Sequence, residues 1–412
     1  MIKSDPLEIE AVAPEHRLRL CVVGDFDGVH TRSWLDYFVQ RGHEVHAVSY
    51  YPPARPPEGV RMHALRPAPT GGGRPDAIGA RPGLAHRAGQ KLPPSLQRFA
   101  NLVRYRRAGL RRTVEEIAPE LLHAHYLVEH GFYATATAHQ PYIVSAWGSD
   151  VLVEARSPLN RAIARFVLQR AKLATANNRY MAREMVLKLG IERAWVQHIV
   201  LGASRYFLER PEASVNVAPT PEHPPTVIST RSLDTSLYNT DTIIRAMARV
   251  RRQLPAARLI MVGEGRQRQR IEALVARIGL DDAVQFPGLL NQEEFRDALA
   301  DAEVFVSVPS SDATSVALLQ AMAVGSFPVI SDLPSQQELV EHGVGGLRVP
   351  VRDERALAEA IVEALEDREL RRSAVEHNRR FVEEYGLQET NMAKMEAWYY
   401  RLAGRSGETQ TA

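Results

Sequence analysis

The chain has 412 residues, of which 45% are hydrophobic and 24% charged, which excludes a disordered or fibrous protein and favours two globular domains. The single cysteine, Cys21 in RLCVVG, excludes an intrachain disulfide and a thiolate metal centre, and its apolar neighbours predict a buried thiol. Without an apolar run of eighteen residues, and with an acidic start broken by prolines, the chain is expected to be cytoplasmic.

The net charge of +2 is unevenly distributed along the chain. Residues 1–206 hold 28 Lys/Arg and 18 Asp/Glu, a net +10, whereas residues 207–412 hold 23 and 31, a net −8. A basic half attracts an anionic acceptor or membrane headgroups, or it complements the acidic half. The charge pattern leaves these three interpretations open.

Short apolar runs alternate with helical patterns along the whole chain. In the first half we expect strands at 19–24, 44–50, 121–125, 142–147 and 173–176, with helices at 31–41 and 159–170. In the second half we expect strands at 226–230, 258–263, 283–286, 304–308 and 327–331, with helices at 240–253, 267–278 and 292–301. A capping box, Asn291 with Glu294, precedes the last of these helices. The alternation predicts two doubly wound, parallel α/β domains in tandem.

The same patterns suggest where the domains end. We expect an N-terminal domain at 1–206, a linker at 207–224, a C-terminal domain at 225–385 and a final helix at 386–412 that packs on the N-terminal domain. The linker lacks periodicity and is rich in proline. Residues 67–94, rich in glycine and proline, are expected to form a loop within the first domain.

The segment SSDATSVALLQAMAVG, which begins at residue 310, joins an expected strand to an expected helix. Ligands bind at such loops in open parallel sheets. If the helix begins near Thr314 or Ser315, its first amides lack partners and its dipole is positive there, so a phosphate fits. Asp312 and Gln320 are then placed to bind sugar hydroxyls. Alternatively, Thr314 and Ser315 are ordinary N-caps and Gln320 faces solvent.

Residues 305–353, with LIMVGEGRQRQRIEALVARIGL and VQFPGLL, resemble the donor domain of retaining nucleotide-sugar glycosyltransferases of the GT-B fold, family 4 or group 1 type. A looser resemblance through RGHEV, LLHAHY, WGSD and LGASRYF extends it over most of residues 18–353. It implies two Rossmann-like domains facing each other across a cleft. It also implies a metal-independent hexosyltransferase of the EC 2.4 type. Besides the acceptor, such an enzyme uses a UDP- or GDP-sugar as co-substrate and needs no cofactor.

The resemblance assigns donor-binding positions. Two family glutamates that hold the sugar and the ribose correspond to Asp312 and Gln320, while the arginine and lysine on the diphosphate correspond to Arg231 and Tyr238. Glu338 matches a further family glutamate, or it is a helix-capping acid; Arg231 is otherwise a surface arginine. The remaining expected donor contacts are Gly28, Gly263, Leu290, Thr314, Ser315 and Val316.

The first half is expected to supply the acceptor side. The resemblance places His125 in the site, gives Asp150 the role of orienting an acceptor hydroxyl, and puts Trp147 where relatives often have histidine. Asp27 and His30 are further acceptor-side candidates, although His30 equally suits a helix cap. The expected catalytic residues are His125, Asp150, Arg231 and Asp312. No metal site is predicted, because histidines 123, 125 and 130 lack acidic or cysteine ligands at fixed spacing.

Residues 95–116 form an Arg-rich amphipathic pattern. Such a helix suits peripheral contact with an anionic membrane, or it packs its apolar stripe on the sheet. No nucleic-acid partner is expected.

The sequence therefore predicts transfer of a hexose, with retention, to a hydroxyl of a glycan, glycolipid or small molecule. The substitutions at the donor positions leave open a catalytically silent nucleotide-sugar-binding protein. An epimerase of the same architecture is a further alternative.

Overall fold

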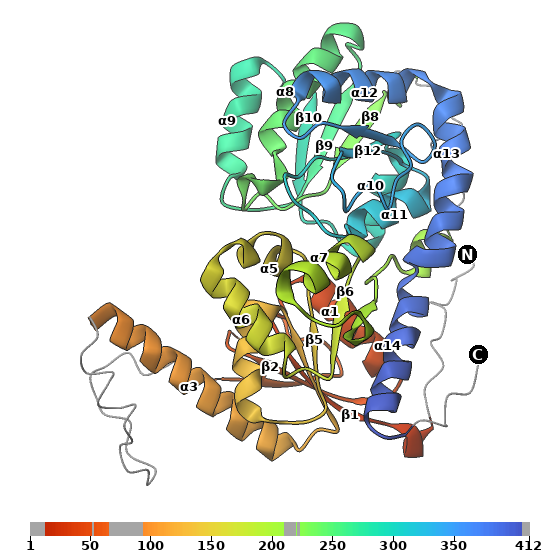
Figure 1. Ribbon diagram of the computed structural model, residues 1–412. Helices are drawn as coiled ribbons and strands as arrows, with labels where there is room; N and C mark the ends of the chain where they lie inside the picture. The colour runs from red at the N-terminus through yellow and green to blue at the C-terminus, as the bar shows by residue number, and fades with distance from the viewer. Residues whose placement is uncertain (1–12, 52, 66–93, 210–219, 221–222, 406–412) are drawn as a thin grey trace. The chain divides into compact units, whose positions relative to one another are not determined.

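The computed structural model describes residues 13–51, 53–65, 94–209, 220 and 223–405. The chain divides into two units, each built around one sheet with helices on its faces (Figure 1). Unit 1 comprises Met1–Thr175, Met185–Gln197 and Met395–Ala412, and unit 2 comprises Ala176–Glu184 and His198–Lys394. No helix in the described part of the chain is long and apolar enough to cross a membrane.

The sheet of unit 1 has seven strands in the order β3-β2-β1-β4-β5-β6-β7. Their bounds are β1 (Arg19–Val23), β2 (Glu44–Ser49), β3 (Arg61–Ala64), β4 (Leu121–His125), β5 (Tyr142–Ser145), β6 (Leu173–Ala176) and β7 (Val196–His198). β1 pairs in parallel with β2 and β4, and β4 with β5, so these strands end at one edge. Their residues are mostly buried, as a parallel sheet covered on both faces requires.

The α-helices of the first half lie between these strands along the chain. They are α1 (Val29–Gln40), α3 (Pro94–Ile117), α4 (Phe132–Ala134), α5 (Ser149–Leu152), α6 (Pro158–Leu168) and α7 (Arg179–Leu189). In α3, Leu110 and Val114 are buried whereas Arg104 and Arg111 are exposed, so this part packs on unit 1. The side chains of residues 94–102, which complete the predicted membrane-facing surface, lie outside the described residues.

The sheet of unit 2 has six strands in the order β10-β9-β8-β11-β12-β13. Its strands are β8 (Thr226–Ser229), β9 (Arg258–Val262), β10 (Val284–Gly288), β11 (Val304–Ser307), β12 (Phe327–Ser331) and β13 (Leu347–Val349). The helices that follow β7 are α8 (Thr240–Gln253), α9 (Arg268–Ile278), α10 (Gln292–Asp301), α11 (Val316–Val324), α12 (Glu354–Glu366), α13 (Arg368–Phe381) and α14 (Gln388–Leu402). All five neighbouring strand pairs are parallel, so the loops after the strands share one edge of the sheet.

Alternate residues of β11 enter two hydrophobic clusters, one on each face of the unit 2 sheet. Val304 and Val306 belong to the cluster that includes α8, α9 and α12. Phe305 belongs to the cluster that includes α10 and α11, in which Leu318 and Met322 of α11 are fully buried. Helix α11 is apolar on nearly all sides and is therefore buried. This burial holds its first residues at the edge of the sheet where the strands have their carboxyl ends.

Helix α14 begins in unit 2 and ends in unit 1. Within unit 1, the buried Glu396 carboxylate accepts hydrogen bonds from His43 Nε2 at 2.7 Å, Arg41 Nε at 3.1 Å and Tyr37 Oη at 3.2 Å. His43 Nδ1 accepts the Leu18 amide at 3.1 Å, so the ring proton lies on Nε2 and points at Glu396. The end of α14 is therefore bonded to α1 and the start of β2.

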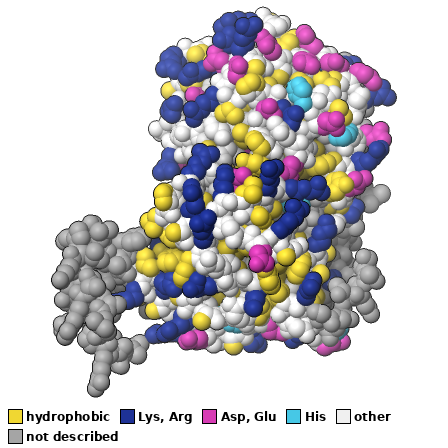
Figure 2. All heavy atoms as spheres, viewed as in Figure 1, with side chains coloured by type: hydrophobic (Ala, Val, Ile, Leu, Met, Phe, Trp, Pro, Cys, Tyr) yellow, Lys and Arg dark blue, Asp and Glu magenta, His cyan; other side chains and the backbone are white. Residues whose placement is uncertain are grey.

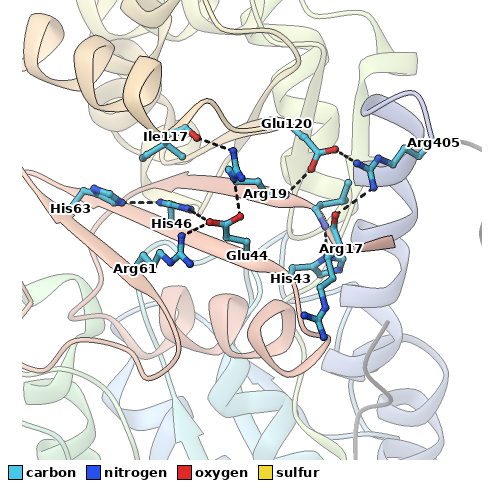
Figure 3. Close-up of polar contacts among 11 residues, drawn as sticks. Arg17, Arg19, His43, Glu44, His46, Arg61, His63, Ile117, Glu120 and Arg405 are labelled. Atoms are coloured by element: carbon cyan, nitrogen blue, oxygen red, sulfur yellow. Dashed lines mark hydrogen bonds and ion pairs between the residues drawn. The ribbon is translucent and has the colours of Figure 1, made fainter. Parts of the chain in front are cut away.

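Figure 3 shows a polar cluster toward the amino ends of β1, β2 and β3. Glu44 accepts a hydrogen bond from Arg19 Nε at 2.8 Å, contacts Arg61, and lies 3.1 Å from His46 Nε2. His46 Nδ1 lies 2.9 Å from Nε2 of His63, which belongs to the edge strand β3. These contacts attach β3 to the rest of the sheet near the amino ends of the strands, opposite the edge where the strands have their carboxyl ends.

The structure confirms two doubly wound, parallel α/β units. It adds the short edge strands β3, β7 and β13, which the apolar pattern did not predict. The capping box of Asn291 and Glu294 is present at the start of α10, and Cys21 is buried. The predicted loop at 67–94 and most of the predicted linker at 207–224 lie outside the described residues, and the predicted domain limits stay predictions.

The frequency of acidic side chains on the surface also differs between the two units. On the face drawn in Figure 2, Asp and Glu side chains are more frequent over unit 2 than over unit 1. This agrees with the net −8 of residues 207–412 and the net +10 of residues 1–206.

Candidate functional site

The loop between β11 and α11 is the centre of the candidate donor site in unit 2. Helix α11 begins at Val316 with Ser315 as N-cap, whose hydroxyl accepts the Leu318 amide at 3.2 Å. Among the described residues, the amides of Val316 and Ala317 have no hydrogen-bond partner. These two donors and the helix dipole give the loop an affinity for an anionic group.

The backbone of this loop is fixed by hydrogen bonds from several segments of unit 2. The bonds are Ser310 N to Leu237 O at 2.8 Å, Ser331 Oγ to Pro309 O at 2.7 Å, Ser335 Oγ to Asp312 O at 2.7 Å, Gln336 Nε2 to Ala313 O at 2.9 Å and Thr314 Oγ1 to Asn177 O at 2.5 Å. Thr314 is therefore an anchor of the loop, and the N-cap is Ser315 alone. A loop held in this way is preorganised for a ligand.

Arg231, Tyr238 and Asp312 come together beside this loop. The Arg231 guanidinium donates from Nε to Ser307 Oγ at 2.8 Å and from Nη2 to Asp312 Oδ2. Its Cζ lies 5.2 Å from the centre of the Tyr238 ring, within cation–π distance. The second Asp312 oxygen accepts the Ala313 amide at 2.9 Å. The three side chains therefore lie together, and their predicted contact with a donor stays a prediction.

The pairing with Asp312 leaves Arg231 able to bind a further anion. A guanidinium has five N–H donors, and Ser307 and Asp312 each use one of them here. Two nearby arginines are engaged elsewhere: Arg268 contacts Glu264 and bonds Glu272 at 2.8 Å, and Arg266 is 3.5 Å from Asp234. Arg231 is thus the cation that this cluster offers to a ligand.

The glycine loop after β9 packs directly on the Arg231 loop. Gly263 has a φ of +141°, and a Cβ there would lie 2.6 Å from the Arg231 carbonyl oxygen. Gly265 has a φ of +155°, and a Cβ there would lie 2.3 Å from the Asp234 amide. Side chains at these two positions would push the loops apart, so Gly263 contributes space and backbone shape to the site.

Glu338 makes the contacts of the capping alternative. Its Oε2 accepts the Arg179 amide at 2.9 Å and its Oε1 accepts the Tyr180 amide, at the start of α7. A direct contact with the donor stays a prediction for this residue. Gln320 and Leu290 are half-buried, and their predicted donor contacts also stay predictions.

In unit 1, His125 ends β4 inside an aromatic cluster. Its ring centre lies 5.1 Å from Trp34, 5.1 Å from Trp147 and 4.8 Å from His123. It is 2% exposed, and neither ring nitrogen has a hydrogen-bond partner among the described residues. Burial, with the neighbouring histidines, lowers the pKa of His125 well below its ordinary value, so the ring is neutral at neutral pH.

His123 is part of a hydrogen-bonded chain behind His125. Its Nδ1 lies 2.6 Å from Tyr399 Oη and its Nε2 lies 2.8 Å from Ser145 Oγ. Burial lowers the pKa of His123 to about 3. Tyr399 belongs to α14, 276 residues away in the sequence, so no local pattern could have identified this contact.

The predicted role of Asp150, orienting an acceptor hydroxyl, does not agree with the structure. Asp150 is fully buried, and its carboxylate accepts the amides of Trp147 at 3.1 Å, Gly148 at 3.0 Å, Val151 at 3.1 Å and Leu127 at 3.0 Å. Burial raises its pKa to about 6, although these amides favour the charged form. Asp150 therefore bonds the loops after β4 and β5 to each other, and its carboxylate is buried behind them.

The loop after β1 carries Asp27 and His30, which were predicted on the acceptor side, and Gly28, which was predicted to contact the donor. Gly28 is the N-cap of α1, and a Cβ there would meet no atom within 4 Å. Asp27 is exposed and accepts the Ala54 amide at 2.8 Å. His30 lies in α1, but its side chain is outside the described residues. The roles of these three residues stay predictions.

Two parallel α/β units with candidate ligand loops at the carboxyl edges of their strands define the GT-B class of glycosyltransferases. Two family models match the chain: Glycosyltransferase Family 4 over residues 28–202, and Glycosyl transferases group 1 over residues 212–381. Together they span most of its length. The chain belongs to this family of glycosyltransferases, whose members take the sugar from a nucleotide-sugar donor.

Two individual relatives and one solved structure are also similar to the chain. The N-acetyl-alpha-D-glucosaminyl L-malate synthase of Bacillus anthracis is 22% identical over 288 residues, 68% of this chain and 74% of that protein. The putative colanic acid biosynthesis glycosyltransferase WcaL of Escherichia coli is 34% identical over 168 residues, 39% of this chain and 41% of WcaL. The crystal structure of Anabaena HepE with UDP and glucose has a TM-score of 0.70 at 16% identity, covering 92% of this chain and 98% of HepE. This last similarity concerns the fold.

Proposed function

We propose that this glycosyltransferase moves a hexose from a UDP- or GDP-sugar to an acceptor hydroxyl with retention of configuration. The observation that carries the proposal is the cluster at the start of α11, where Arg231 and the unpartnered amides of Val316 and Ala317 come from one sheet edge. A diphosphate can accept hydrogen bonds from these two amides and from the Arg231 N–H donors that Ser307 and Asp312 leave free. The HepE structure, solved with UDP, and the naming of WcaL for colanic acid support a UDP-sugar and a glycan or glycolipid acceptor.

In the proposed reaction the acceptor oxygen attacks the anomeric carbon on the face that the diphosphate leaves. The bond between that carbon and the phosphate oxygen breaks, and the leaving phosphate takes the acceptor proton. Negative charge grows on the diphosphate as the bond breaks, and Arg231 and the α11 amides stabilise it. Asp312 and Gln320 are proposed to bind the sugar and the ribose. No protein nucleophile and no metal are needed in this scheme.

One structural feature favours a second candidate, a nucleotide-sugar-binding protein without turnover. Arg231 is already paired with Asp312, and Tyr238 offers a ring where relatives have a second cation. Charge stabilisation of the leaving group is therefore smaller than with two cations. This feature weakens catalysis more than it weakens binding of the uncharged parts of the donor.

A panel of UDP-, GDP- and ADP-sugars tests the proposal. Each donor is mixed with the protein, with and without an extract of glycans and glycolipids, and free nucleotide is measured. Nucleotide release that depends on the acceptor extract is the expected result. Tight donor binding without release would indicate the silent binding protein, and release without any acceptor would indicate the epimerase. The cytoplasmic location and the contact of residues 95–116 with anionic lipid remain separate proposals.

A further inference from the structure

A polar cavity lies in unit 2 beside the loop between β11 and α11. Its lining residues differ from those of the proposed donor site. Its volume is about 260 Å³. The lining residues are Ser236, Asn239, Asp241, Thr242, Gln267, Arg270, Ile271 and Arg352. They come from the start of α8, the start of α9 and the loop after β13, and none of them belongs to the proposed donor site.

Arg352 lines this cavity in a conformation that disfavours a side chain. Its φ is +62°, in the left-handed region, where a residue other than glycine costs about 1 kcal/mol. Its Nε donates to Asn239 Oδ1 at 3.1 Å, and its two Nη groups have no partner among the described residues. Backbone strain of this kind is often retained for function. The strained backbone presents unpaired guanidinium donors at the cavity.

Asn239 fixes the position of Arg352. It is 2% exposed, and its Nδ2 donates to Val308 O at 2.8 Å and to Ser310 Oγ at 2.9 Å. With Oδ1 accepting from Arg352, each polar group of this side chain has a partner. A buried amide satisfied on all sides is rigid, so the guanidinium that it holds is held in place too.

The charges around the cavity are unequal. Arg270 is exposed and makes no hydrogen bond or ion pair with the described residues. The opposing carboxylate, Asp241, lies 3.8 Å from Arg245 on the next turn of α8. Two arginines with free donors thus face one carboxylate that already has a cationic neighbour.

We propose that this cavity is an anion-binding site for phosphate or a small phosphate ester, separate from the donor site. Guanidinium groups bind phosphate oxygens through paired N–H donors, and two arginines on different loops can hold one phosphate between them. Ser236, Thr242 and Gln267 line the same space and supply neutral donors. The inference does not depend on the proposed transferase reaction.

Titration calorimetry with inorganic phosphate and with glycerol phosphate, at constant ionic strength, tests this proposal on the full chain. Arg352→Gly and Arg270→Gln should each weaken phosphate binding at least about tenfold. Arg277→Gln, an exposed arginine on the same helix as Arg270, is the matched control and should bind as the wild type. The tighter of the two ligands identifies whether the site takes the free ion or the ester.

Arg352→Gly also separates binding from folding. Glycine removes the guanidinium but relieves the left-handed strain, so the melting temperature should stay the same or rise while binding is lost. The titrations are run in saturating UDP, which occupies the proposed donor loop, and again in the Arg231→Ala variant, and phosphate binding at the cavity should persist in both. Binding that survives both cavity variants, that UDP or Arg231→Ala abolishes, or that is absent in the wild type would overturn the proposal.

Discussion

At the scale of single residues, the proposed donor site depends on one guanidinium, that of Arg231. Arg231 is fixed by Ser307, by Asp312 and by the ring of Tyr238, and its remaining N–H donors have no partner among the described residues. The sequence suggested Asp312 because it lies in the loop after a strand of a parallel sheet, and it suggested Arg231 and Tyr238 through the resemblance to the family. It could not identify Ser307 as the residue that orients Arg231, because a serine at the end of a buried strand has no distinctive pattern.

Replacing Arg231 should affect turnover far more than stability. Arg231→Ala should lower kcat/KM by about 10²–10³-fold, because it removes the charged donor aimed at the leaving group. Nucleotide release measures the first effect and the melting temperature the second. Arg249→Ala, which breaks a half-exposed pair with Glu354, is the control and should keep full activity. Equal losses of activity and stability in Arg231→Ala would show that the arginine is structural.

Restoring a second cation should strengthen the site. Tyr238→Lys places an ammonium next to Arg231 and should raise UDP affinity by about tenfold, since one added charge-assisted bond is worth about 1.5 kcal/mol or more. Tyr238→Phe, which removes the hydroxyl alone, should change affinity little. Titration of UDP into the three proteins gives the comparison. Weaker binding by Tyr238→Lys than by wild type would mean that the diphosphate does not lie beside residue 238.

The role that the resemblance suggested for Asp150 depends on the local backbone geometry. Asp150 was expected to orient an acceptor, but its fully buried carboxylate binds four backbone amides instead. An aspartate just after a glycine turn is equally suited to bind the amides of that turn, and sequence does not distinguish the two uses. The direction in which the short Asp150 side chain points depends on how its loop packs.

At the scale of elements, the sequence predicted α11 and the strands beside it well. An apolar run that follows a polar loop fits few structures other than a buried helix or strand. Ser315 supplies the N-cap that starts the helix. The short strands β3, β7 and β13 were missed because three or four residues at a sheet edge carry too little periodicity. Their place is set by pairing with neighbouring strands, as β3 pairs in parallel with β2.

The glycine loop after β9 gives a prediction at this scale. Gly263→Ala should destabilise unit 2 by about 1–3 kcal/mol and reduce turnover, because its Cβ would collide with the Arg231 carbonyl. Gly279→Ala is the matched control: Gly279 also has a positive φ, +72°, but a Cβ there meets nothing within 4 Å. Both variants should lose stability in urea denaturation, but only Gly263→Ala should also lose activity. Full activity in Gly263→Ala would separate this loop from the site.

At the scale of the whole molecule, α14, like α7, has residues in both units. Its end is bonded into unit 1 through Glu396, and the partners of Glu396 lie more than 350 residues earlier in the chain. The alternation of strands and helices predicted two α/β domains, because it needs only local patterns. The contacts of Glu396 and Tyr399 could not be predicted, because they depend on how distant segments pack.

Removing the Glu396 charge should destabilise unit 1. Glu396→Gln should cost about 2–4 kcal/mol at neutral pH, because Arg41 loses its buried counter-ion and His43 loses a strong acceptor. Chemical denaturation followed by near-UV signals checks this value. Glu115→Gln, which breaks an exposed pair with Arg111, should cost well under about 1 kcal/mol. A negligible effect of Glu396→Gln would show that α14 is held by apolar contacts alone.

The same carboxylate gives a pH dependence. Burial opposes ionisation of Glu396, but hydrogen bonds from His43 and Arg41 outweigh it and lower its pKa below the ordinary 4.5. The unfolded chain then binds the proton more readily, so the stabilisation is complete above about pH 5 and is lost as the pH falls through the folded pKa. The stability difference between wild type and Glu396→Gln should therefore shrink in acid. A difference that grows below pH 4 would contradict this assignment.

The most direct test of the account is an experimental structure of the chain with UDP bound. We predict that a phosphate oxygen lies within about 3.2 Å of the Val316 or Ala317 amide and of an Arg231 Nη atom, with Asp312 beside it. A nucleotide bound elsewhere, with these amides and Arg231 free of phosphate, would contradict it.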